Sequence, residues 1–253
     1  MAASTHPIFE YALALGDDAL VLGQRIAEWC SNGPYLEEDI ALSNVALDYI
    51  GRARMLLSYA GEAEGQGRNE DQLAFTRDCR DFRNLLIYEL PRGDFGFTMA
   101  RQLAVDAFEV PFFEALTRSS DRTLAGIAGK ALKESRYHLR HSSGWVIRLG
   151  AGTDESHRRM QDGLDQVWGY TPELFQMDAA EAALAESGVA VDRAELRQQW
   201  ESTLDEVLKQ ATLGRPADDW QIDGGRRGVH TEHLGHLLSE LQFMQRAYPG
   251  LEW

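Results

Sequence analysis

The sequence predicts an all-α protein, and three observations favour this class. Apolar residues recur at helical spacing along most of the chain, no segment shows sustained period-two alternation, and the prolines fall at joints between segments apart from Pro111. A period near 3.6 is typical of amphipathic helices, whereas half-buried strands alternate with a period of two. We therefore expect one helical domain over residues 1–253: a bundle of long helices with additional C-terminal helices.

Each expected helix is an apolar stripe that ends at turn-forming residues. The first stripe stops at the Asn-Gly-Pro sequence of residues 32–34, the second at the glycine-rich residues 61–67 and the third at Pro91, as such residues commonly end helices. Pro111 is expected to kink the fourth helix, and residues 214–228 form one long irregular connection. The expected helices span residues 15–29, 42–60, 75–90, 99–113, 127–145, 155–168, 192–213 and 231–247.

Charge and composition exclude several functions. The chain carries 40 acidic against 25 basic residues, a net charge of −15, whereas nucleic-acid binding needs a basic surface. The same charge argues against anionic membrane surfaces. Cys30 and Cys79 are isolated, so neither a disulfide framework nor a zinc ribbon is expected. No apolar run approaches the roughly 18 residues that cross a bilayer, and no secretory signal is evident, so we expect a cytoplasmic protein.

Four acidic positions on these helices match a di-iron pattern that has lost its histidines. A ferritin-like di-iron bundle takes one Glu from each of two helices and a Glu-x-x-His from each of the other two. The corresponding positions are Asp18, Asp48 with Gly51, Asp106, and Glu134 with Tyr137. Since neither second position is His, and transition metals favour nitrogen ligands, we expect a ferritin-like fold with a degenerate site, no metal and no catalytic residue in this chain.

Other interpretations of these acids stay open at the sequence level. Asp106 lies on the core face of its helix, where a carboxylate needs an ion pair or a metal. Glu134 shares a helix face with His138, so this pair could bind a metal or hydrogen-bond. Asp17 precedes Asp18, and the spacing does not decide which of the two faces inward.

Two further clusters attract attention. His230, His233 and His236 lie at three-residue spacing near the start of the last helix, but the string does not match the His-Glu-x-x-His zinc motif. We interpret them as packing and hydrogen-bonding groups, although their role is not decided.

The second cluster is basic. Arg77, Arg80 and Arg83 would share one face of a helix. This face is either solvated, with Arg77 paired to Asp81, or a ridge that grips phosphates or the carboxylates of a partner.

Several sequence runs together carry a resemblance to a known family. The most specific is GGRRGVHTEHLG at residues 224–235, followed by QFMQR at 242–246. The others are LGDD at 15–18, LGQR at 22–25, EWC at 28–30, ALDYIGRAR at 46–54, LAFTRD at 73–78 and KESRYHLR at 133–140. In these runs the chain resembles the structural C subunits of 1,2-phenylacetyl-CoA epoxidases, from Leu15 to Trp253.

The resemblance implies a function as part of a complex. A C-type subunit would bind and stabilise a homologous catalytic A subunit, which holds the di-iron centre that converts phenylacetyl-CoA and oxygen to the ring epoxide. A separate NADPH-dependent reductase subunit would supply electrons. This chain would then be a component of an oxygenase without being its catalytic subunit.

The resemblance also suggests contact surfaces. Arg77 and Arg80, together with residues 81–84, could contact the partner or border the channel for the coenzyme A portion of phenylacetyl-CoA. Those four residues are Asp81, Phe82, Arg83 and Asn84. Aromatic residues of the bundle helices could supply the centre of the subunit interface, namely Phe97, Phe108, Phe112 and Trp145.

Two alternatives remain. The chain could be a metalloenzyme in its own right, built on the carboxylates and His138. It could also be an independent acyl-CoA-binding module.

Overall fold

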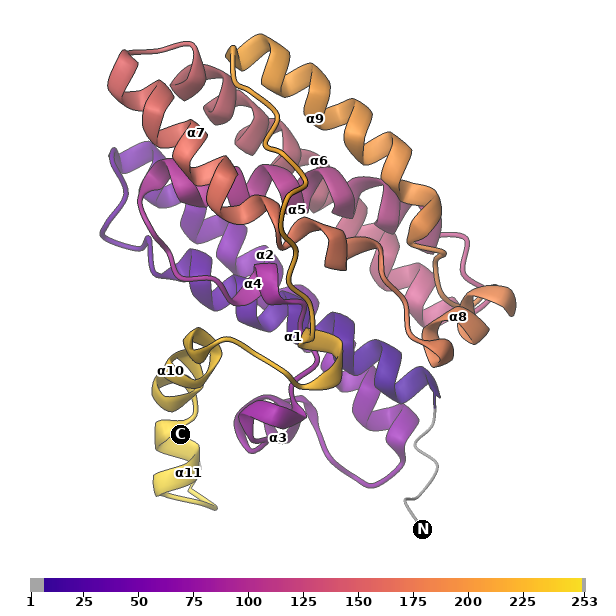
Figure 1. Cartoon of the computed structure of the whole chain (residues 1–253). Coiled ribbons are helices and arrows are strands. Elements are labelled where there is room, and N and C mark those ends of the chain that lie inside the picture. The colour runs from indigo at the N-terminus through magenta and orange to yellow at the C-terminus, as the bar shows by residue number, and fades with distance from the viewer. Residues whose placement is uncertain (1–6, 252–253) are drawn as a thin grey trace. The chain divides into compact units, whose positions relative to one another are not determined.

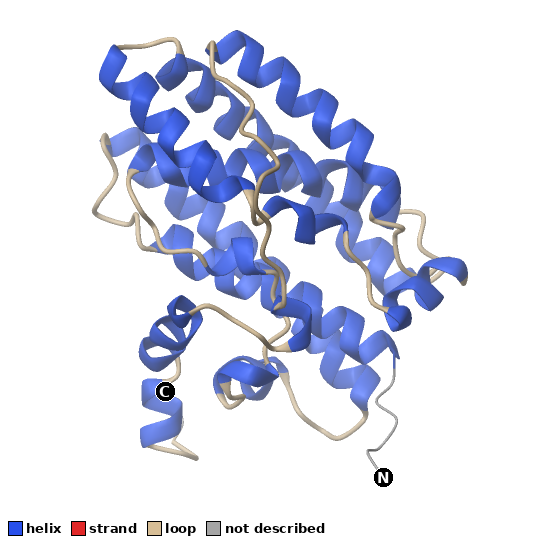
Figure 2. Ribbon diagram, viewed as in Figure 1, coloured by secondary structure: helices blue, strands red, loops and turns tan. Residues whose placement is uncertain are grey.

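A computed structural model describes residues 7–251, and in this part of the chain every regular element is a helix (Figure 2). The predicted all-α class is therefore confirmed. The longer helices are α1 (Pro7–Ala27), α2 (Leu36–Glu64), α5 (Phe95–Leu116), α6 (Arg122–Gly150), α7 (Asp154–Trp168) and α9 (Arg197–Ala211). The shorter ones are α3 (Glu70–Phe75), α4 (Leu86–Glu89), α8 (Ala179–Glu186), α10 (Glu232–Leu241) and α11 (Phe243–Ala247), with 3-10 turns η1 (Cys79–Asp81), η2 (Thr171–Phe175), η3 (Ala194–Leu196) and η4 (Gly225–Arg227).

The chain divides into two compact units. Unit 1 comprises Met1–Pro91 and Gly224–Trp253, and unit 2 comprises Arg92–Asp223. Figure 1 traces the chain from α1 in indigo to α11 in yellow, and both of these helices belong to unit 1. The single domain that the sequence predicted over residues 1–253 stays a prediction.

In unit 1, α1 and α2 form an antiparallel hairpin. A Cβ at Gly16 would lie 2.7 Å from the Leu57 side chain, and one at Gly23 would lie 2.9 Å from Ile50. Later positions of α1 therefore face earlier positions of α2. Because the two glycines are seven residues apart, they lie on the same side of α1, and their missing side chains let the helices approach closely.

The third predicted helix, over residues 75–90, is wrong. The structure has α3, the single turn η1 and the short α4 instead. The competing interaction comes from α1, because the carboxylates of Asp17 and Asp18 accept the backbone N–H groups of Arg83 and Leu85 at 2.9 and 2.8 Å. These N–H groups would otherwise bond within a helix, so tertiary hydrogen bonds override the periodicity.

The last predicted helix is broken in two. Gln242 separates α10 from α11, and its side-chain amide donates to the carbonyl oxygens of Ala74 and Arg77, both at 3.0 Å. These bonds attach the C-terminal segment to the irregular stretch after α3. The segment is therefore an integral part of unit 1.

Unit 2 is built on α5, α6, α7 and α9, which pack on one another. The α5 helix continues through Pro111. The indole of Trp200 on α9 donates to the backbone oxygen of Ala104 on α5 at 2.8 Å, which satisfies a buried N–H group. Helices α7 and α9 match predicted segments within a few residues, whereas α8 was not predicted.

The aromatic residues suggested for a subunit interface mostly belong to the core. Phe108, Phe112 and Trp145 are buried, and only Phe97 is partly exposed. Phe108 stacks on Phe112, with ring centroids 5.4 Å apart. Phe108, Phe112 and Trp145 are therefore core residues of unit 2.

Candidate functional site

The structure brings three buried side chains of unit 2 together. Asp106 and Glu109 lie one turn apart on α5, and His138 faces them from α6. One ligand atom from each lies within 4.8 Å of the other two, and all three side chains are buried. Among the described residues, this is the one group of three or more His, Cys, Asp or Glu side chains with metal-binding geometry.

Two serines on α6 orient the carboxylates of this cluster. The hydroxyl of Ser142 donates to Asp106 Oδ2 at 2.7 Å, and that of Ser135 donates to Glu109 Oε2 at 2.9 Å. Ser135, His138 and Ser142 are spaced three and four residues apart, so they form one face of α6. This face turns toward α5, and it carries only one imidazole.

Of the two degenerate positions on α6, Glu134 lies at the edge of this inward face, whereas Tyr137 lies off it. Glu134 pairs with Lys130 on the same helix at 3.3 Å. Tyr137 is 40 % exposed, and its ring stacks on His141. The Glu-x-x-Tyr spacing therefore brings only its Glu near the inward face, and the group with metal-binding geometry combines His138 with Asp106 and Glu109.

Asp18, on α1 of unit 1, is held by an arginine. Its two carboxylate oxygens accept from the guanidinium of Arg226 at 2.6 and 2.9 Å, and one of them also accepts from the backbone N–H of Leu85. Arg226 lies in the GGRRG sequence, 208 residues away. The charge of this acid is thus balanced by a cation of the same unit.

Both acids of the Asp17–Asp18 pair face inward. Asp17 is fully buried and forms a bidentate ion pair with Arg77, one branch of which measures 2.9 Å. The sequence left open which of these two acids faces inward. Both do, since each accepts hydrogen bonds from the segment after α3. Asp48 and Gly51, on α2, are half-buried.

Arg77, Arg80 and Arg83 do not share one exposed helix face, which both alternatives for this cluster assumed. Arg77 is buried against Asp17, and the guanidinium of Arg83 donates to the backbone oxygens of Arg80 and Phe82 at 2.7 and 2.9 Å. Phe82 and Asn84 are also buried. Of the six residues suggested for substrate or partner contact, Arg80 and Asp81 are exposed and Arg83 is partly exposed.

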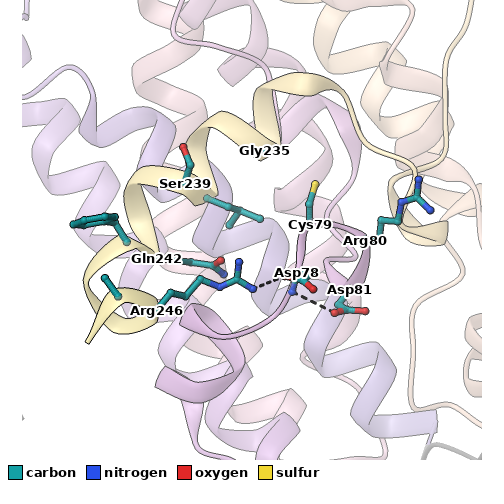
Figure 3. Close-up of a pocket in the computed structure, with 11 residues that line it drawn as sticks. Asp78, Cys79, Arg80, Asp81, Gly235, Ser239, Gln242 and Arg246 are labelled. Carbon is teal, nitrogen blue, oxygen red and sulfur yellow. Dashed lines mark hydrogen bonds and ion pairs between the residues drawn. The ribbon is translucent and has the colours of Figure 1, made fainter. Parts of the chain in front are cut away.

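A cavity of about 780 Å³ lies in unit 1 between η1 and the C-terminal helices α10 and α11 (Figure 3). Arg246 reaches across it to pair with Asp78, while Arg80 points away from this pair. Apolar side chains from α10 and α11, Leu238 and Phe243, complete the lining. The charged groups of the lining balance, so the cavity shows no strong preference for an anion.

Cys79 lines the same cavity but is not an activated nucleophile. Burial, with the nearby charge of Glu89, raises the pKa of its thiol. A thiol is reactive as the thiolate, so Cys79 stays protonated and inert at neutral pH.

The first histidine of the C-terminal cluster is an ion-pair partner. Nδ1 of His230 lies 2.7 Å from Glu89 Oε2, and its Nε2 lies 3.0 Å from the backbone oxygen of Phe82. Both neighbours are acceptors, so the doubly protonated, cationic ring satisfies both contacts. His233 is half-buried and His236 exposed, and the group with metal-binding geometry among the described residues does not include these histidines.

The environment of His230 sets a pH dependence. Burial by itself would lower its pKa, but the hydrogen bond and charge of Glu89 outweigh it, and the net pKa lies above the ordinary value of 6.5. A pKa raised by folding gives stability that is complete below the unfolded value and lost as pH rises through the folded value.

We therefore expect the stability difference between the wild type and His230→Gln to shrink as pH rises from 5.5 to 9. Urea unfolding of both proteins at several pH values measures it. A constant difference, or one that grows with pH, would contradict the assignment of a cationic His230.

Sequence reasoning missed Glu109, Ser135 and Ser142. Glu109 follows Asp106 at i+3, which places both on one helix face, and this spacing was an available signal. The serines gave no signal, because short hydroxyl side chains occur on many helix faces. Arg226 was noted only for family resemblance, not as the partner of Asp18.

Together, the helices and the acidic positions that lack their histidines define a helical-bundle protein whose carboxylate site is incomplete as a di-iron site. The chain belongs to the family described as phenylacetic acid catabolic protein, whose model matches residues 1–253. It is 50 % identical over 243 residues to the C subunit of the 1,2-phenylacetyl-CoA epoxidase of Escherichia coli (strain K12), covering 96 % of this chain and 98 % of that protein. These matches confirm the predicted resemblance and the ferritin-like all-α class. In the described part of the chain, no helix is long and apolar enough to cross a membrane.

Proposed function

We propose that this chain is a non-catalytic subunit of a multicomponent oxygenase that epoxidises the ring of phenylacetyl-CoA. It binds and stabilises a homologous catalytic A subunit that carries the di-iron centre, while an NADPH-dependent reductase subunit supplies electrons. Similarity over nearly the whole length of an epoxidase C subunit supports this role. The complex is proposed to be cytoplasmic.

The observation that carries the proposal is the surroundings of the acidic positions and of the residues that replace the expected histidines. Asp18 is bound by Arg226, Tyr137 is exposed, and Gly51 offers no ligand atom. A di-iron site needs two Glu-x-x-His motifs, and the α5–α6 face supplies one imidazole. The residues present therefore do not fit a di-iron centre, and we assign no reaction step to this chain.

The exposed residues next to η1 remain candidates for contact with substrate or partner. Arg80 and Asp81 line the cavity of unit 1, and Arg83 is partly exposed beside them. We propose that any contact with the coenzyme A portion of phenylacetyl-CoA uses these groups, because Arg77, Phe82 and Asn84 are buried.

One observation favours a second candidate function. Asp106, Glu109 and His138 offer a mixed oxygen and nitrogen ligand set, which suits a single divalent metal ion. A metal-binding role for this chain is therefore the alternative to a purely structural one. An independent acyl-CoA-binding function has no comparable support.

Iron loading distinguishes the two candidates. After anaerobic incubation with ferrous iron and desalting, we expect the purified chain to retain far less than one iron atom, measured by mass spectrometry. About two iron atoms per chain would overturn the proposal. About one, lost again in His138→Ala, would establish the single-metal alternative.

A further inference from the structure

The outer face of α2 presents large apolar side chains to solvent. Tyr35, the N-cap residue of α2, is 64 % exposed, Leu36 is 72 %, Ile40 is 54 % and Leu47 is 67 % exposed. We call these four residues the α2 outer patch. Single exposed apolar residues are common, but several gathered on one surface mark an interaction site.

Helical geometry places three of the four patch residues on one side of α2, and Tyr35 precedes them as the N-cap. Leu36, Ile40 and Leu47 follow at i, i+4 and i+11, a spacing that keeps side chains on the same face. From Leu36 to Leu47 the helix rises by about 16 Å at 1.5 Å per residue, a length suited to contact with one partner helix. The patch is therefore a stripe.

The fold of unit 1 does not require these residues to be apolar. The opposite face of α2 is buried and carries the side chains that pack in the core, such as Leu42, Val45 and Tyr49. Exposed positions of a helix tolerate polar residues. Apolar residues here match a surface that becomes buried in a complex.

Charge around the patch selects the kind of partner. No Lys, Arg or His occurs between Arg25 and Arg52, whereas Glu37, Glu38 and Asp39 form the first turn of α2 beside Leu36 and Ile40. The rim of the patch is thus acidic. A second copy of this chain would set like charges against each other across a two-fold interface, and an anionic lipid or nucleic-acid surface would be repelled.

We infer that the α2 outer patch binds the catalytic subunit of the same oxygenase, through an apolar surface bordered by Lys and Arg on that subunit. The inference rests on the proposed function and specifies where the partner docks. The apolar stripe supplies the buried centre, and the acidic rim orients the partner and speeds its association.

The test measures binding of the full-length chain to the purified catalytic subunit by calorimetry. We expect Ile40→Glu and Leu47→Glu each to weaken binding at least tenfold, since each places a charge in the apolar centre. Ile222→Glu is the matched control, because Ile222 is 40 % exposed and lies in unit 2. Circular dichroism and unfolding midpoints check that all three variants stay folded.

The outcomes separate the inference from the function on which it rests. Tight binding by the wild type and both patch variants would overturn the docking site and leave the proposed function intact. No binding by the wild type would overturn both. A wild-type homodimer that Ile40→Glu dissociates, seen by light scattering, would assign the patch to a second copy instead and overturn the inference.

A salt series tests the acidic rim separately. We expect binding by the wild type to weaken as salt rises, because salt screens exposed charges. Glu37→Lys should weaken binding and reduce this salt dependence. Salt-independent binding with unchanged affinity of Glu37→Lys would show that a basic border is not what the patch recognises.

Discussion

Asp17→Ala is expected to destabilise the protein by about 3–5 kcal/mol, the cost of removing one partner from a buried ion pair. Asp17 is fully buried and accepts from both the guanidinium of Arg77 and the backbone N–H of Arg83. Its loss leaves the charge of Arg77 buried without an anionic partner, held by two carbonyl oxygens and the ring face of Phe82. Urea unfolding followed by circular dichroism measures the loss.

Two controls define the cause of this effect. Glu155→Ala removes an acid from exposed pairs with Arg158 and Arg159, which are expected to contribute little. The double variant Asp17→Leu, Arg77→Met removes both charges and should recover much of the lost stability, because apolar replacements of buried pairs are often tolerated. A double variant as unstable as Asp17→Ala would show that the charge left on Arg77 is not the cause.

The positions of Asp17 and Asp18 illustrate what a sequence can predict. Their place on a buried helix follows from apolar periodicity, which is a local property. Their partners do not, because Arg77 and Arg226 lie 60 and 208 residues away. Such pairs depend on how the chain returns to α1, and spacing along one helix carries no information about that path.

The α5–α6 cluster shows the same limit on a smaller scale. The sequence placed Asp106 on a core face correctly, since Asp106 is buried. For α6 it assigned the family positions to Glu134 and Tyr137, whereas Tyr137 is exposed and the group with metal-binding geometry includes His138. One residue of shift turns a helix by about 100°, so Tyr137 and His138 point in different directions although they are neighbours in the chain.

The prediction of a helix from Phe75 to Leu90 failed for a different reason. Its apolar residues recur at helical spacing, and Phe82, Leu86 and Leu90 are indeed buried. However, the acids of α1 accept its backbone N–H groups, and a carboxylate is a stronger acceptor than a carbonyl group. The apolar periodicity therefore predicted correctly which side chains are buried, but it predicted the wrong backbone conformation.

The C-terminal segment supplies the second large effect, because Gly225 is packed directly against the loop before α4. A Cβ at this position would lie 2.0 Å from the backbone oxygen of Asn84 and 3.0 Å from the Cα of Leu85. Both atoms belong to the backbone, so no side-chain rotation relieves the clash. Gly225→Ala must therefore displace one of the two segments.

Displacement would break the bonds that hold the segment in unit 1. Arg226, the next residue, pairs with Asp18, and the backbone N–H of Thr231 donates to Glu89 at 2.6 Å. Overpacking of a rigid site alone typically costs about 1–3 kcal/mol, and losing the Asp18 pair leaves a nearly buried carboxylate. We expect a total loss of at least about 3 kcal/mol and faster proteolysis after residue 223.

The same substitution ten residues later should act in the opposite direction. Gly235 lies inside α10, is exposed, and a Cβ there meets nothing within 4 Å. Alanine is favoured over glycine within a helix by roughly 0.5–1 kcal/mol, so Gly235→Ala should stabilise unit 1 slightly. Unfolding midpoints and proteolysis rates of the two variants provide the comparison. Equal stability of the two variants would mean that the turn at residues 224–228 does not hold the C-terminal segment in place. The ion pair between Asp18 and Arg226 would then have to form without this turn.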